Sequence, residues 1–114
     1  MVTLLDDLGD FSRAEVAAQK ALSIFPEKAD FYFHLGNIFG KTGKFEKSEV
    51  NYKTALSIGP VISLYHSNMG VLYHRWKKYP ESVEHYNKAL KLDPDNASAR
   101  SNLESIKKSF REQH

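Results

Sequence analysis

The chain has 114 residues, and its 16 Lys and Arg against 14 Asp and Glu give a formal net charge of +2. So small a charge does not by itself indicate a nucleic-acid partner. The lack of cysteine excludes disulfides and thiolate metal sites, and no apolar run is long enough to span a membrane. We expect no direct membrane insertion by this segment. The lack of cysteine does not fix the compartment, for which the cytoplasm is the default.

A 34-residue period organises the chain. Pro26, Pro60 and Pro94 follow one another at this spacing, and each ends a similar phrase: QKALSIFP, YKTALSIGP and YNKALKLDP. Such a period indicates stacked supersecondary units. Within each unit, apolar residues recur at spacings of three, four and seven, in two segments joined by a short polar turn, which favours helices over strands. Each unit is therefore predicted to be a helical hairpin.

In chain order, the period divides a single domain, residues 1–114, into four parts. A partial repeat over 1–28 keeps one helix at residues 1–8 and a complete second helix, as expected for a piece of a longer array. Full repeats follow over 29–62 and 63–96, and a last helix occupies 97–114. In that helix Glu104 and Lys107 fall in columns that elsewhere hold glycine and an aromatic residue, which predicts a C-terminal capping helix with a solvated outer face.

Two glycines sit where glycine is unfavourable. Gly36 and Gly70 lie inside predicted helices, where glycine costs about 1 kcal/mol relative to alanine. This cost suggests that another backbone passes too close for a Cβ atom. After Pro94, either Asp95 or Asn96 is placed to cap the helix that follows.

Aligned on the period, the two full units share a residue pattern that resembles the tetratricopeptide repeat, whose usual length is 34 residues. The units read as follows: Tyr32-x2-Leu35-Gly36-x2-Phe39, Ser48-x3-Tyr52, Ala55, Pro60, and then His66-x2-Met69-Gly70-x2-Tyr73, Ser82-x3-Tyr86, Ala89, Pro94. His66 replaces the first aromatic residue, and Lys77 stands where Gly9 and Gly43 mark the turn. The resemblance implies an all-α solenoid of seven antiparallel helices in a right-handed superhelix.

In that family the first helix of each unit lines a concave groove that binds a peptide or helix of a partner protein. The faces that the packing columns leave free supply the predicted groove residues: Phe33, His34, Asn37, Lys41, Asn68, Val71, His74, Arg75 and Asn102. Asn68 and Asn102 lie one period apart and could form a ladder that grips an extended peptide backbone. The alternative is that these asparagines are only solvated.

One family subtype, the chaperone adaptors, clamps a C-terminal carboxylate with lysines, asparagines and an arginine. Asn37 and Asn68 match its two asparagines, but Phe33, Ser98 and Asn102 stand where its cations belong. Without those cations the charge-assisted hydrogen bonds are lost. We therefore predict that the chain does not bind a chaperone tail.

Other chemistry finds little support in the sequence. None of the five histidines forms an H-x3-H pair, and no nucleophile, phosphate-loop or dinucleotide motif occurs. We expect no metal, no cofactor and no enzymatic activity. The turn RWKK at 75–78 could bind phosphate, an acidic partner or a single-stranded nucleic acid, but a solvated turn with Trp76 folded back is favoured. Asn96-Ala97-Ser98 is a glycosylation sequon and also a polar helix start.

Three functions remain open. The leading one is a scaffold or adaptor segment that binds a protein or peptide partner, with no nucleic acid. The second is the substrate-recognition arm of an endoplasmic reticulum membrane glycosyltransferase, since LGNIFG and NMGVLYH resemble the arrays of transmembrane-and-TPR-containing proteins linked to O-mannosylation. The third is self-association into a homo-oligomer through the incomplete N-terminal repeat.

Overall fold

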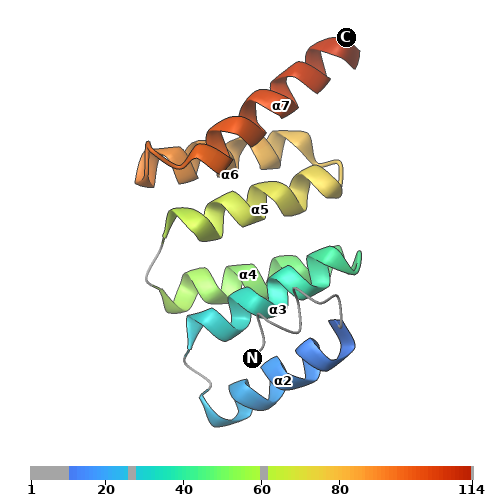
Figure 1. Ribbon diagram of the computed structural model, residues 1–114, viewed down its shortest axis with the longest axis vertical. Coiled ribbons are helices and arrows are strands. Elements are labelled where there is room, and N and C mark those ends of the chain that lie inside the picture. The colour runs from blue at the N-terminus through green and yellow to red at the C-terminus, as the bar shows by residue number, and fades with distance from the viewer. Residues whose placement is uncertain (1–10, 26–27, 60–61, 114) are drawn as a thin grey trace. The chain divides into compact units, whose positions relative to one another are not determined.

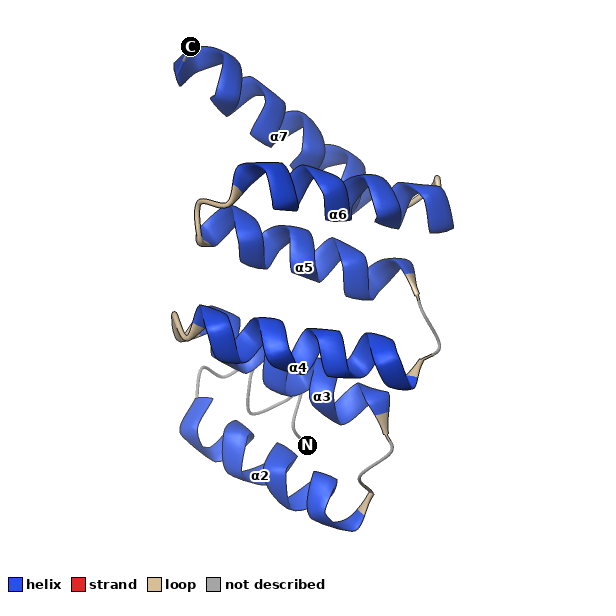
Figure 2. Cartoon of the chain, turned by 180° about the vertical axis from the view of Figure 1, so that it is seen from behind, coloured by secondary structure: helices blue, strands red, loops and turns tan. Residues whose placement is uncertain are grey.

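The computed structural model describes residues 11–25, 28–59 and 62–113. Over these residues all regular secondary structure is α-helix, joined by short turns (Figures 1 and 2). The helices are α2 (Phe11–Ile24), α3 (Ala29–Lys41), α4 (Phe45–Ile58), α5 (Ser63–Arg75), α6 (Tyr79–Leu92) and α7 (Ala97–Gln113). The all-α prediction is confirmed for this part of the chain. Of the seven helices expected, the one at residues 1–8 lies outside the described residues.

The helices belong to two compact units, residues 1–60 and 61–114, and each is described by itself. In the first unit, α3 and α4 form a helical hairpin and α2 packs against α3. In the second unit, α5 and α6 form the equivalent hairpin, and α7 packs against both of its helices. Both hairpins follow from the predicted division of a repeat into two apolar segments around a polar turn.

The turns of the two hairpins share one backbone conformation. Each has a residue with positive φ just after the first helix, which is Gly43 (φ 79°) in one hairpin and Lys77 (φ 62°) in the other. In both, the next amide donates to a carbonyl of the preceding helix at 2.8 Å: Lys44 to Phe39, and Lys78 to Tyr73. Glycine takes this conformation at no steric cost, whereas a residue with a Cβ pays about 1–2 kcal/mol. The departure at Lys77 is therefore a local strain.

Each hairpin is also held by a tyrosine ring that lies on a helical glycine. A Cβ atom added to Gly36 would lie 2.5 Å from the Tyr52 ring, and one added to Gly70 would lie 2.5 Å from the Tyr86 ring. The expectation of a close backbone is wrong in this detail, because the nearest atoms belong to an aromatic side chain. The serine one turn before each tyrosine donates to the same glycine's carbonyl at 2.6 Å: Ser48 to Gly36, and Ser82 to Gly70.

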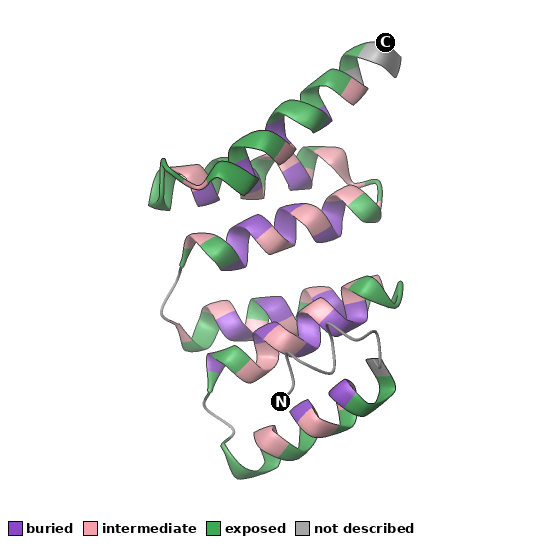
Figure 3. Ribbon diagram, viewed as in Figure 1, coloured by how far each residue is buried: buried purple, intermediate pink, exposed green. Residues whose placement is uncertain are grey.

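The last helix packs with the apolar side chains that its periodicity predicts. Ala99, Leu103 and Ile106 are buried in one cluster with residues of α6, while Glu104 and Lys107 are exposed. Figure 3 shows buried and exposed positions along the same helix. Asn96 caps the helix, since its Oδ1 accepts the Ala99 amide at 3.0 Å. The solvated outer positions and the cap are both as predicted.

The contact between the Tyr52 ring and Gly36 predicts that adding one methyl group at position 36 destabilises the fold. We expect Gly36→Ala to lower the free energy of unfolding by about 1–3 kcal/mol, because overpacking against Tyr52 outweighs alanine's helix propensity. In a Tyr52→Ala background the same change should be neutral or stabilising, which a double-mutant cycle in urea measures. The exposed control Asp30→Ala should cost far less. A stabilised Gly36→Ala single variant would contradict this packing.

Candidate functional site

The groove residues predicted in the first unit take part in its packing. Phe33 is buried at 6% exposure with its ring 5.8 Å from that of Tyr52, so its predicted place on a free face is wrong. The cause is the ring of Tyr52, which lies on Gly36 and also packs against Phe33, one turn earlier on α3. His34 is half-buried beside Phe33, and Lys41 is exposed in the last turn of α3. Asn37 accepts a hydrogen bond from the Tyr52 hydroxyl through its Oδ1.

In the second unit, four predicted residues lie together around a pocket of about 430 Å³. Its walls come from all three helices of the unit and from the turn between α5 and α6: Val71, His74, Arg75, Lys77, Tyr79, Tyr86 and Asn102. Asn68 is half-buried on α5 and does not line this pocket. The ladder of Asn68 with Asn102 therefore stays a prediction, whereas the structure does bring Val71, His74, Arg75 and Asn102 to one place.

A buried hydroxyl without a hydrogen-bond partner lines the pocket. Tyr86 has no exposed surface, and its hydroxyl has no partner in the structure. The corresponding Tyr52 donates to Asn37, but the residue one period after Asn37 is Val71, which has no acceptor. A buried polar group without a partner costs about 1–3 kcal/mol, so its occurrence calls for an explanation.

The hydroxyl stays protonated at any physiological pH. Burial raises the pKa of Tyr86 to about 12, an effect that nearby Ser82, Asn102 and the charge of Arg75 oppose only in part. Neither Ser82 nor Asn102 meets hydrogen-bond geometry with the hydroxyl. Tyr86 is therefore a neutral phenol in the lining of the pocket, with an O–H group that can donate one hydrogen bond.

The pocket is electrostatically positive. Arg75 and Lys77 are exposed, no acidic residue lines the pocket, and neither cation has an ion-pair partner among the side chains that the structure describes. His74 packs edge-on against Tyr79 at 5.7 Å. Hydrogen-bond donors thus surround a space in which Asn102 Oδ1 and the imidazole of His74 are the only side-chain acceptors besides hydroxyls.

The RWKK turn is divided between packing and pocket. Trp76 folds back on the hairpin as predicted, with its ring stacked on Tyr73 at 6.1 Å and the Lys78 ammonium 3.8 Å above it. Arg75 and Lys77 are exposed, as a solvated turn predicts, and they also line the pocket. Sequence reasoning missed Tyr86 and Tyr79 as residues of this pocket, and it considered Lys77 only as part of the RWKK turn. The available signal was the replacement of Asn37 by Val71 one period later, opposite an unchanged tyrosine.

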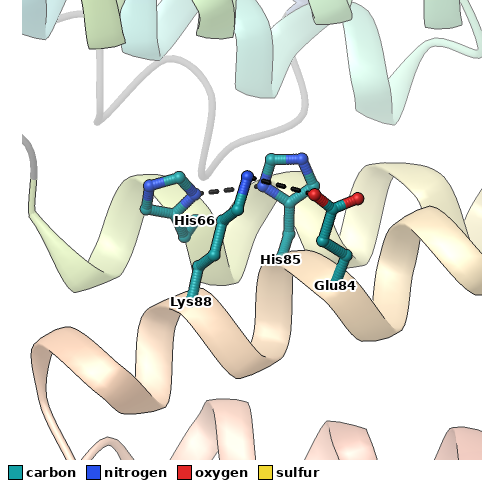
Figure 4. A network of polar contacts seen from close by, with 4 residues as sticks. All are labelled: His66, Glu84, His85 and Lys88. Atoms are coloured by element: carbon teal, nitrogen blue, oxygen red, sulfur yellow. Dashed lines mark hydrogen bonds and ion pairs between the residues drawn. The ribbon is translucent and has the colours of Figure 1, made fainter.

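A pair of histidines forms a second polar cluster in the same unit (Figure 4). His66 Nδ1 and His85 Nδ1 are 3.0 Å apart, so one ring donates and the other accepts. Beside them the Lys88 ammonium contacts Glu84 at 3.2 Å. In the part of the chain that the structure describes, no group of three or more His, Asp or Glu side chains converges as a metal site would require. The pair is best understood as a packed hydrogen bond.

Comparison with known proteins agrees with the helix pairs. The family model for the tetratricopeptide repeat matches residues 29–61, and a second model of the same description matches residues 63–96. Together they cover more than half of the sequence, and the chain belongs to the tetratricopeptide repeat family. No curated protein matches it. Within the described ranges, no helix combines the length and apolar character needed to cross a membrane.

Solved structures share the fold at low sequence identity. The first TPR domain of Spaghetti (RPAP3), bound to the HSP90 peptide SRMEEVD, is 18% identical with a TM-score of 0.87, covering 96% of this chain and 87% of that one. The TPR domain of Arabidopsis OM64 is 18% identical with a TM-score of 0.87 over 95% and 89%. A mutant O-GlcNAc transferase of Thermobaculum terrenum is 24% identical with a TM-score of 0.86, over 92% of this chain and 20% of that one.

The two tyrosines predict opposite results of one substitution. Tyr52→Phe removes the hydrogen bond to Asn37 and should lower the free energy of unfolding by about 0.5–1.5 kcal/mol. Tyr86→Phe removes an unpartnered buried hydroxyl and should be neutral or stabilising. Urea unfolding followed by circular dichroism measures both. Equal losses in the two variants would mean that Tyr86 has a partner in solution.

The histidine pair predicts a loss of stability in mild acid. Burial lowers the pKa of His66 below its ordinary value of 6.5, and the charge of Lys88 lowers it further. The unfolded chain then binds a proton at higher pH than the folded chain, so the contribution is present above pH 6.5 and is lost as the pH falls. Relative to His66→Phe, the native chain should lose unfolding free energy between pH 7 and pH 5. Parallel pH profiles would contradict the assignment.

Proposed function

We propose that the chain is a protein-interaction module, part of a scaffold or adaptor, that binds an extended segment of a partner on the face that α5 and α7 share. The observation that carries this proposal is the pocket of the second unit, where donors from both helices and the turn surround a buried hydroxyl with no internal partner. An extended peptide offers a carbonyl acceptor at every residue and can therefore satisfy several such donors at once. Binding rather than catalysis is the role that this arrangement favours.

The solved neighbours support the class of partner and leave its identity open. The Spaghetti domain was solved with a chaperone peptide, which supports a peptide as the ligand class for this fold. At under 25% identity, that likeness does not carry the peptide itself to this chain. The positions that need cations for a chaperone tail are Phe33, Ser98 and Asn102, so we propose a partner other than such a tail.

The proposal is tested with a peptide library. Random dodecapeptides displayed at the N-terminus of a phage coat protein are selected on the immobilised 114-residue chain, and enriched sequences are synthesised for fluorescence anisotropy. Asn102→Ala and Asn68→Ala should each weaken binding by about 1–3 kcal/mol, which is the cost of leaving a peptide group unpaired. The two losses need not add, because both side chains would contact one ligand.

The matched control for these variants is Asn87→Ala, since Asn87 is exposed on α6 and does not line the pocket. Its affinity should equal that of the native chain. A proline in the middle of the peptide should reduce binding more than a shuffled order of its flanking side chains, because an extended backbone is what the asparagines grip. Unchanged affinity in both asparagine variants, with unchanged helicity, would place the binding site elsewhere.

The two other functions stay predictions. Residues 1–10 of the N-terminal repeat, through which the chain would self-associate, lie outside the described residues. Light scattering across a concentration series tests self-association directly. A role as the recognition arm of a membrane glycosyltransferase would require a multi-span segment in a longer parent protein.

A further inference from the structure

We propose that the pocket of the second unit binds the carboxylate of an acidic side chain, Asp or Glu, within the partner peptide. This inference rests on the proposed function and names the chemistry that the site selects. It concerns a residue inside the peptide and requires no free C-terminus. The argument depends on three features of the pocket: its unpartnered hydroxyl, its charge, and the strained residue at its rim.

The unpartnered hydroxyl indicates that the ligand brings an acceptor. In the first unit, the chain itself supplies the acceptor, because Asn37 Oδ1 receives the Tyr52 hydroxyl. In the second unit, Val71 takes the place of that asparagine, the Tyr86 hydroxyl has no internal partner, and both residues line the pocket. The tyrosine hydroxyl thus has an internal acceptor in one repeat and none in the next.

The charge indicates that the acceptor is anionic. Arg75 and Lys77 lie on the pocket walls without an ion-pair partner among the described side chains, and no carboxylate lines the pocket. A neutral amide could accept from Tyr86, but only an anion would also be attracted by the charges of Arg75 and Lys77. Hydrogen bonds to a carboxylate are about twice as strong as those between neutral groups. Val71 gives the pocket an apolar wall that suits the methylene groups of such a side chain.

The strained residue indicates that the lysine is kept for its side chain. Lys77 has φ 62° at the turn position where the other hairpin has Gly43 with φ 79°. Glycine at position 77 would remove the backbone strain, and because Lys77 is exposed, no buried packing would be lost. Strain of this kind persists where the surroundings or the function require it, and here the side chain lines the pocket.

The experiment uses the dodecapeptides selected above, synthesised with amidated C-termini so that a terminal carboxylate cannot contribute. We expect the selected sequences to share an Asp or Glu at one position. Replacing that residue by Asn or Gln should weaken binding to the native chain about tenfold, which corresponds to the loss of one charge-assisted contact. This acid-to-amide ratio is the quantity compared across variants by fluorescence anisotropy.

Three variants should lower the ratio, and Arg75→Gln and Val71→Asn should bring it to about threefold or less through different causes. Arg75→Gln removes a cation. Val71→Asn supplies Tyr86 with the internal acceptor that Asn37 gives Tyr52, and it should keep or raise the unfolding midpoint, so a loss of binding cannot be ascribed to unfolding. Lys77→Gly should lower the ratio while raising the midpoint. Lys91→Gln removes an exposed cation outside the pocket and should keep the full ratio.

The outcomes separate this inference from the function on which it rests. Peptides that bind in an Asn102-dependent way but need no acid would overturn the inference and leave the proposed function standing. An acid whose ratio is unchanged in both Val71→Asn and Arg75→Gln would place the carboxylate outside this pocket. Phosphoserine that binds at least about tenfold tighter than Glu at the same position would reassign the site to phosphate. A library without binders would overturn both proposals.

Discussion

The rest of each hairpin depends on a tyrosine ring placed flat against a glycine of the neighbouring helix. At Gly36 and Gly70 the ring occupies the volume where any other residue would have its Cβ. The helices can approach this closely because the serine one turn before each tyrosine also bonds the glycine carbonyl at 2.6 Å. Glycine weakens an isolated helix by about 1 kcal/mol, and burying an aromatic ring offsets that cost several times over.

This contact determines where the tyrosine hydroxyl lies. In the first unit the residue after the glycine is Asn37, which accepts the Tyr52 hydroxyl. In the second unit the residue at this position is Val71, the Tyr86 hydroxyl has no partner, and both residues line a pocket. A difference of one side chain thus converts a structural position into a candidate binding site, with the fold unchanged.

The sequence predicted the features that periodicity controls. The helix pairs, the turns, the cap at Asn96 and the solvated face of α7 all follow from the 34-residue spacing and from residue type. Contacts between helices were harder to predict. Phe33 was expected on a free face, because a helical wheel shows directions but not how far a tyrosine from α4 reaches. Whether the Tyr86 hydroxyl has a hydrogen-bond partner depends on the distance and geometry of every nearby polar group. A pattern of residue types along the sequence does not contain that information.

The pocket concentrates two local costs in one place. An unpartnered hydroxyl costs about 1–3 kcal/mol and a lysine with positive φ costs about 1–2 kcal/mol, which together form a considerable part of the 5–15 kcal/mol typical of domain stability. The first unit avoids both costs, with Asn37 beside its tyrosine and Gly43 in its turn. The same two positions therefore distinguish the repeats, and both changes act on the walls of a single pocket. Two independent losses of stability, at Tyr86 and at Lys77, thus occur at one pocket. This is expected where residues are selected for binding rather than for folding.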